Sequence, residues 1–150
     1  MSKIILLDSG PLGIAANPKV STETAAFNRW LRAQLVSGTN VGIPDIADYE
    51  VRRELIRANR TKSLWKLDAL QSQFDYLPVG TPILRRAAQL WAQTRNMGKP
   101  TADALSLDAD VIITAQASLL IEDGDEVVIV TTNPIHLSLF VPAARWQDIA

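Results

Sequence analysis

Short apolar runs alternate along the chain with longer segments in which apolar residues recur every three or four positions. The runs contain four to six residues, and groups of turn-forming residues such as Ser9-Gly10-Pro11 bound them. Uninterrupted apolar runs of this length are typical of strands covered on both faces of a sheet. The pattern therefore predicts strands at residues 3–8, 41–44, 76–79 and 127–131.

Helical spacing fills the intervals between these runs. In the first interval Ala26, Trp30 and Ala33 fall on one stripe, and the third helical pattern stops at Gly98. The predicted helices span residues 22–36, 46–59, 82–97 and 110–121. Strands that alternate with helices favour βαβ units and a parallel sheet. We expect an α/β fold, a three-layer α/β/α sandwich in which residues 3–8 form an interior strand.

Composition limits the class of protein. A chain of 150 residues that is 47% hydrophobic can form one domain with a core, and it contains no internal repeat or linker. We therefore expect a single domain over residues 1–150. The sequence has no cysteine, which excludes disulfides, thiolate metal sites and a cysteine nucleophile. The first apolar run is too short for a signal peptide, and no run has the length of a membrane helix, so we expect a cytoplasmic protein.

Basic residues are concentrated in one segment, although the net charge of the chain is only −1. Residues 52–66 contain six basic residues and one acid, Glu54, so this segment carries +5 and the rest of the chain −6. A run of charge is usually a solvated helix face. Beside a metal-loaded acidic site it would instead guide an RNA backbone through non-specific contacts, and the candidate contacts are Arg52, Arg53, Arg57 and Arg60.

Three acidic residues fall where a parallel α/β sheet forms its sites. Asp8 closes the first predicted strand, Glu50 lies early in the helix after the second strand, and Asp110 opens a later helix. Each alone has a structural explanation as a turn former or helix cap. Together they would repel one another unless a cation lay between them. Oxygen ligands without a His or Cys cluster favour Mg²⁺ or Mn²⁺ over zinc.

Four segments in order resemble the PIN-domain ribonucleases, and in particular the VapC-type toxins of toxin–antitoxin systems. The segments are residues 6–10 (LLDSG), 46–55 with Glu50, 110–117 (DVIITAQA) and 130–133 (VTTN). The resemblance implies a PIN-like fold and a metal-dependent endoribonuclease that hydrolyses RNA phosphodiester bonds. It also implies a homodimer held inactive by a cognate antitoxin, for which residues 22–36 and 52–66 are candidate dimer surfaces.

The resemblance also assigns roles to individual residues. Asp8, Glu50 and Asp110 would be the catalytic metal ligands, and Ser9 and Thr131 would be supporting hydroxyl residues. Asn133 stands where the family often has an acid or an amide. Because an amide is a neutral ligand, this position puts a second metal ion in doubt. Asp108 is a further candidate ligand.

Several alternatives stay open at this point. Asp103 and Asp108 fit capping or solvated positions better than ligand positions, and His136, the only histidine, fits loop packing better than general-base chemistry. A PIN scaffold that binds a protein without catalysis would also suit a neutral Asn133. A phosphatase of the haloacid dehalogenase type also places an aspartate after the first strand, but it needs an acid where this chain has Gly10. No phosphate-binding G-x-x-x-x-G-K-[ST] motif occurs.

Overall fold

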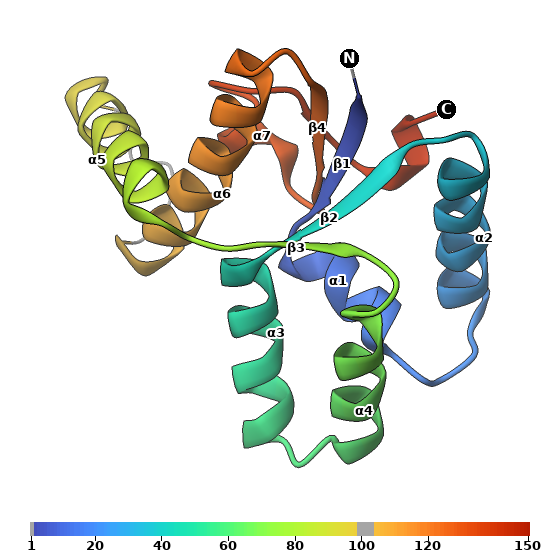
Figure 1. Ribbon diagram of the computed structural model, residues 1–150. Helices are drawn as coiled ribbons and strands as arrows, with labels where there is room; N and C mark the ends of the chain where they lie inside the picture. The colour runs from blue at the N-terminus through green and yellow to red at the C-terminus, as the bar shows by residue number, and fades with distance from the viewer. Residues whose placement is uncertain (1, 99–103) are drawn as a thin grey trace.

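The computed structural model describes residues 2–98 and 104–150, and its centre is a five-stranded parallel sheet (Figure 1). β1 (Lys3–Leu7) lies between β2 (Asn40–Pro44) and β4 (Glu126–Val130), and the strand order is β3-β2-β1-β4-β5. The outer strands β3 (Asp75–Leu77) and β5 (Ala143–Ala144) are short. All four strand pairs are parallel. The predicted parallel sheet with an interior first strand is confirmed.

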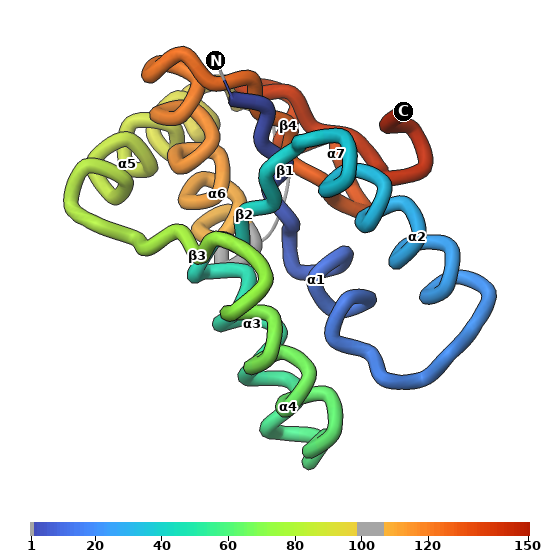
Figure 2. The backbone as a smooth tube through the Cα atoms, turned by 45° about the vertical axis from the view of Figure 1, so that its right-hand side comes forward, coloured from blue at the N-terminus to red at the C-terminus, as the bar shows by residue number. Residues whose placement is uncertain are grey.

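Helices cover both faces of this sheet (Figures 1 and 2). On β1, Ile5 and Leu7 enter one core with the side chains of α1, α2, α3 and α4, whereas Leu6 enters a second core with α6 and α7. This alternation follows from the two-residue period of a strand, which sends successive side chains to opposite faces. The predicted three-layer α/β/α arrangement is therefore confirmed. The helices of the first core are α1 (Ser9–Ala16), α2 (Thr22–Val36), α3 (Asp45–Arg57) and α4 (Thr61–Leu70).

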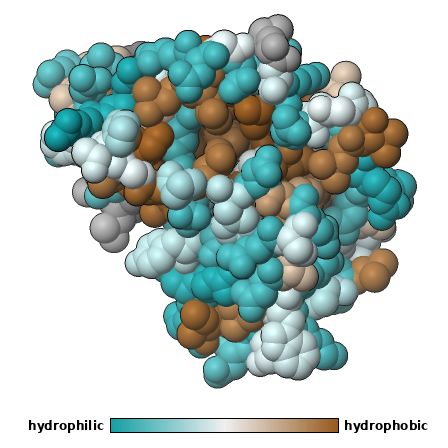
Figure 3. Space-filling model, viewed as in Figure 1, coloured by the Kyte–Doolittle hydropathy of each residue, from teal (hydrophilic) through white to brown (hydrophobic). Residues whose placement is uncertain are grey.

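The second face is covered by α6 (Ala104–Glu122) and the short α7 (Pro134–Leu137). α5 (Thr81–Asn96) packs on the outside of α6 through a third apolar cluster. Figure 3 shows hydrophobic side chains exposed over α6 and the adjacent strands on this face of the molecule, whereas the surface over α3 is mostly hydrophilic, with a smaller hydrophobic patch towards the end of that helix. In the part of the chain that is described, no helix is both long and apolar enough to span a membrane.

The C-terminal segment is fastened to α2. The indole nitrogen Nε1 of Trp30 donates a hydrogen bond of 3.0 Å to the carbonyl of Ile149. Trp30, Phe27 and Trp146 form an aromatic cluster with ring centres 5.7–5.9 Å apart. Figure 1 accordingly shows the C-terminus beside α2, after a 3₁₀ turn at Trp146–Asp148.

The predicted helices exist, but three features differ from expectation. α6 begins at Ala104 rather than at Asp110, so Asp110 lies within a helix and does not open it. Residues 9–16 form a helix although they contain Gly10, Pro11 and Gly13. Pro11 is tolerated in the first turn, where its missing N–H would have no helical partner, and the buried Leu12 anchors the helix to the core. α4 was also not predicted.

Candidate active site

Asp8 lies at the carboxyl end of β1 and caps α1. Its Oδ1 accepts a hydrogen bond of 2.8 Å from the backbone N–H of Ser9, and its Oδ2 accepts one of 2.9 Å from the hydroxyl of Thr131. Thr131 directly follows the neighbouring strand β4 and is buried. Burial raises the pKa of Asp8 more than these two hydrogen bonds lower it. The two hydrogen bonds thus fix the position of the Asp8 carboxylate, while burial makes its charged form less favourable.

The glycine of the LLDSG segment has a packing role at this corner. A Cβ atom on Gly10 would lie 2.8 Å from Cγ2 of Thr132. A larger residue at position 10 would therefore require the exposed side chain of Thr132 to move. Gly10 thus allows the first turn of α1 to lie close to the turn after β4.

Glu50 reaches the same edge of the sheet from α3. Its pKa is raised mainly by burial and next by the negative charge of Asp8. Arg53, one turn further along α3, acts in the opposite direction with its Nη2 3.9 Å from Oε2 of Glu50. Glu50 is therefore close enough to Asp8 for their charges to interact.

Asp110 completes the group from α6. Burial, followed by the charges of Asp8 and Glu50, raises its pKa to about 6. The structure thus brings the three predicted acids together from β1, α3 and α6 at the carboxyl edge of the sheet. Arg53 is the one cation whose charge offsets that of an acid in this group among the described residues.

The donor set is compatible with a hard divalent cation, although the geometry is open. Three mutually repelling carboxylates present only oxygen ligands, which are those that Mg²⁺ and Mn²⁺ prefer. A cation would also relieve the repulsion that raises their pKa values. Among residues 2–98 and 104–150, however, no three His, Cys, Asp or Glu side chains are close enough to enclose a metal ion. Metal binding would need side-chain rotation to bring the oxygens together.

The other candidates near this group lie in different surroundings. Asp108 is exposed and lines a hollow between α5 and α6, and its spacing of two residues turns it away from Asp110. Asn133 is exposed, and its backbone N–H donates a 3.2 Å hydrogen bond to the hydroxyl of Thr131. His136 lies on α7 with a buried Nδ1 that has no partner among the described atoms. Asp103 lies outside the described residues.

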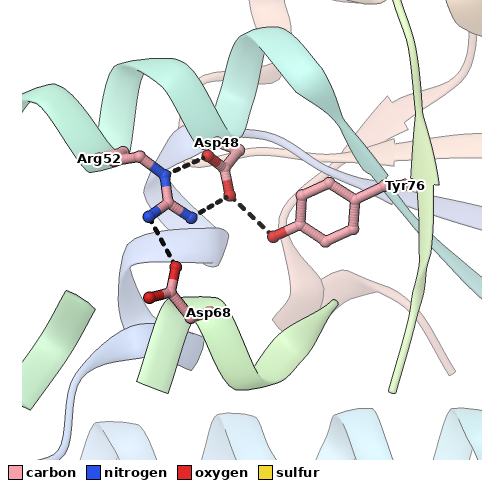
Figure 4. A network of polar contacts seen from close by, with 4 residues as sticks. All are labelled: Asp48, Arg52, Asp68 and Tyr76. Atoms are coloured by element: carbon pink, nitrogen blue, oxygen red, sulfur yellow. Dashed lines mark hydrogen bonds and ion pairs between the residues drawn. The ribbon is translucent and has the colours of Figure 1, made fainter. Parts of the chain in front are cut away.

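Two of the four arginines proposed to contact RNA, Arg52 and Arg57, are paired with acidic residues of this chain. Arg52 donates to Asp48 at 2.8 Å and to Asp68 at 2.7 Å, and the hydroxyl of Tyr76 also donates to Asp48 at 2.8 Å (Figure 4). This network joins α3 to α4 and β3. The prediction of Arg52 as an RNA contact therefore overlooked Asp68, sixteen residues further along the chain.

The other three arginines proposed to contact RNA also differ in whether an acidic residue pairs with them. Arg57 is paired with Glu54 on the same exposed face of α3. Arg53 lies between Glu50 and the exposed ring of Tyr49, whose centre is 5.0 Å from its Cζ. Arg60 precedes α4 and has no acidic partner within 4.0 Å in the described ranges. Arg53 and Arg60 are therefore the two of the four with no hydrogen bond to an acid in the described ranges, and RNA contact by any of the four stays a prediction.

Comparison with known proteins places the fold but gives no match at the level of sequence families. No family model and no curated protein matches this sequence. A chain of FitAcB from Neisseria gonorrhoeae shares the fold with a TM-score of 0.71 and 20% identity, over 97% of this chain and 99% of that one. A chain of VapBC2 from Rickettsia felis, solved bound to a DNA fragment from its promoter, gives 0.73 and 15% identity over 95% and 98%. A chain of DNA-bound VapBC from Salmonella typhimurium gives 0.62 and 18% identity over 97% and 99%.

These identities are low, and the likeness therefore concerns the fold. Since nearly the whole of each chain is covered, the likeness extends over the sheet and both helical layers. The predicted PIN-like α/β/α fold is confirmed at the level of structure, and it is shared with chains of FitAcB and of VapBC complexes.

Proposed function

We propose that this chain is a metal-dependent endoribonuclease and the toxin of a toxin–antitoxin pair. The observation that carries the proposal is the meeting of Asp8, Glu50 and Asp110, where burial and then the neighbouring negative charges raise the pKa values of Glu50 and Asp110. A protein that needed these acids only for its fold would pair them with basic side chains, as it does elsewhere on α3. The fold shared with chains of FitAcB and VapBC assemblies supports the same reading.

In this proposal Asp8, Glu50 and Asp110 hold Mg²⁺ or Mn²⁺. Such an ion, when bound, neutralises the charge that develops on the phosphate and makes water a stronger nucleophile. Thr131 and the backbone N–H of Ser9 fix the orientation of the Asp8 carboxylate through the two hydrogen bonds described above. No side chain of this protein is required as a nucleophile. Asn133 would act, if at all, through the turn that carries Thr131.

The substrate and partners follow from the same proposal. RNA is the substrate, a cognate antitoxin protein is the inhibitor, and the active form is a cytoplasmic homodimer. VapBC from Salmonella typhimurium and VapBC2 from Rickettsia felis were solved bound to DNA. For this chain we propose an analogous complex with an antitoxin.

The proposal is tested by cleavage of an end-labelled RNA in the presence of Mg²⁺, Mn²⁺ or EDTA. Cleavage should require the metal and stop with EDTA. Glu50→Gln should abolish it, because the variant removes one anionic ligand. Glu54→Gln is the matched control, since Glu54 lies one turn further along α3 and is paired with Arg57 on the exposed surface. Equal cleavage by wild type and Glu50→Gln would refute the proposal.

A second candidate is a PIN scaffold that acts by protein binding and has weak or no nuclease activity. Two observations favour it, namely the open arrangement of the acids and the neutral Asn133 in place of a fourth acid. In that case no RNA would be cut at any metal concentration. The Glu50→Gln variant would then bind a partner protein as tightly as the wild type.

A further inference from the structure

Three neighbouring hollows form a continuous groove on the side of the molecule that carries α2 and α4. Their volumes are about 300, 740 and 280 Å³. The first lies between α2 and α4, the second is lined by the loop after α1 and the start of α4, and the third connects them. Lys66 lines the first and third, and Lys19 lines the second and third, so the hollows share their walls.

The groove is lined by cations without acids. Among the described residues that line the three hollows, six are basic and none is Asp or Glu: Lys19, Arg29, Arg32, Arg60, Lys62 and Lys66. None of the six has an acidic partner within 4.0 Å in the described parts of the chain. Lys66 is held instead by a hydrogen bond of 3.0 Å from its Nζ to the carbonyl of Asn17. By contrast, Arg52, Arg57 and Arg86 are each paired with an acid.

The groove and the acidic site share two helices, α1 and α3. Gly13 on α1 and Leu55 on α3 line the largest hollow, and they lie five residues after Asp8 and Glu50 respectively. Five residues of helix correspond to roughly 7–8 Å of rise. Since α1 packs against α3, the same pair of helices carries acids at one end and the beginning of the basic groove further along.

We propose that this groove binds the sugar–phosphate backbone of an RNA strand whose neighbouring phosphodiester lies at Asp8 and Glu50. The six charges are spread over three hollows, which suits a polyanion better than a single phosphate ion. Lysine and arginine contacts to phosphate position a strand without reading its bases. A second copy of this chain is a poor occupant, because a symmetric interface here would place like charges together. The proposed homodimer would therefore use faces of residues 22–36 and 52–66 that lie outside this groove. The proposal rests on the proposed ribonuclease function for the position of the strand relative to the site.

The first test measures RNA binding in the Glu50→Gln background, so that the strand is not cut. A fluorescent single strand of twelve or more nucleotides is titrated at several salt concentrations against the background protein and against the same protein with Arg29→Gln, Arg32→Gln and Lys66→Gln added. We expect affinity to fall at least about tenfold and the slope of log K against log salt to decrease by about 2, since each lost contact to a single strand contributes ~0.7. Arg85→Gln with Arg95→Gln on α5 is the control and should change neither quantity.

The second test blocks the groove without removing any native contact. A Cβ atom on Gly13 would meet nothing within 4 Å, so a longer side chain fits there. Gly13→Glu and Gly13→Gln have nearly the same shape and differ in charge. We expect Gly13→Glu to weaken RNA binding severalfold relative to Gly13→Gln, with equal thermal stability.

The outcomes separate this proposal from the proposed function. If RNA binds in the salt-dependent manner described but is never cut, the groove stands and the ribonuclease proposal fails. If long RNA is cut and the three substitutions affect neither binding nor cleavage, the groove proposal is overturned and the ribonuclease proposal stands. Loss of binding to an acidic partner protein, with RNA binding unchanged, would likewise overturn it by assigning the groove to that protein.

Discussion

Acidic residues on the two sides of α3 differ in whether hydrogen-bond donors surround them. Asp48 is surrounded by donors, because Arg52 and Tyr76 both bind it and Arg52 also binds Asp68 (Figure 4). Glu50, two residues later, has only Arg53 at 3.9 Å and is exposed to the charge of Asp8. Two residues along a helix correspond to a rotation of about 200°, so the two acids point to nearly opposite sides.

The contrast distinguishes an acid that stabilises the fold, Asp48, from an acid whose charge is available to a ligand, Glu50. A partly buried acid with a bidentate arginine and a phenol contributes to stability through charge-assisted hydrogen bonds. Acids that raise one another's pKa oppose folding in the charged form. A fold tolerates such a group where the charge serves binding or catalysis.

The largest effect is expected from Asp8→Asn. The amide keeps an acceptor for Ser9 and a polar contact to Thr131, but it removes a ligand charge. RNA cleavage should fall about 100-fold or more, the range seen when one electrostatic group is removed from an active site. Because the substitution also removes repulsion, the melting temperature of the metal-free protein should stay equal or rise. Calorimetry and a cleavage assay on the same preparation check both effects, and a clear drop in melting temperature would contradict the second.

Asp48→Asn is the matched change on the other side of α3 and should have the reverse effect. It takes the anion away from Arg52 and weakens the acceptor of the Tyr76 hydroxyl. The free energy of unfolding should fall by about 1–3 kcal/mol, as for a part-buried hydrogen bond to a charged group. RNA cleavage by the folded fraction should be unchanged. Urea denaturation followed by circular dichroism measures the loss, and a neutral result would mean that the network is too exposed to contribute.

Acidification should stabilise the metal-free protein through Asp110. Its pKa is about 6 in the folded chain against an ordinary value of 3.8, so between these values the folded state binds more protons than the unfolded state. The contribution therefore grows as the pH falls from 7 towards 4 and is lost as the pH rises through 6. Since Asp110 is partly exposed, we expect on the order of 1 kcal/mol.

Other acids act in the opposite direction and must be subtracted. Hydrogen bonds from Arg57 and Arg86 lower the pKa values of Glu54 and Glu122, so these pairs are weakened as the pH falls. The difference in melting temperature between wild type and Asp110→Asn isolates the Asp110 contribution. That difference should change with pH in EDTA, and a difference independent of pH would contradict the assignment.

The smallest effect is expected from Arg53→Gln. Arg53 lies between the two groups on α3, touching Glu50 at 3.9 Å and the Tyr49 ring at 5.0 Å. As an exposed cation beside the site it should assist substrate binding, so KM for RNA should rise about two- to fivefold with little change in kcat, consistent with the modest energy of exposed charge contacts. Steady-state kinetics distinguish this from a catalytic role, in which kcat would fall.

Much of the fold follows from local pattern. The apolar runs located β1, β2, β3 and β4 to within about two residues. β1, β2 and β4 cross the centre of a sheet that is covered on both faces, and β3 is a short outer strand. The position of Asp8, Glu50 and Asp110 at one sheet edge followed from parallel topology. β5 was not predicted because its two residues, Ala143 and Ala144, are too few to carry a pattern.

The early helix shows where local pattern fails. Residues 9–16 have turn-forming residues at four of their first five positions, and the sequence therefore favours a loop. The helix exists because Asp8 caps it and Leu12 is buried against α2 and the sheet. Tertiary packing is the usual source of helix stability, and here it outweighs propensity.

By itself, then, the sequence determined the parallel α/β architecture and which acids lie at the carboxyl edge, since both depend on the order of apolar and polar residues along the chain. Only the tertiary structure decided which of the described basic residues are paired with acids. Arg52 pairs with Asp68, sixteen residues further along the chain. Lys19, Arg32 and Lys66 come from the loop after α1, from α2 and from α4, and they line one groove. Electrostatic energy depends on distance in space, and a count of charges along the chain cannot distinguish a paired arginine from an unpaired one.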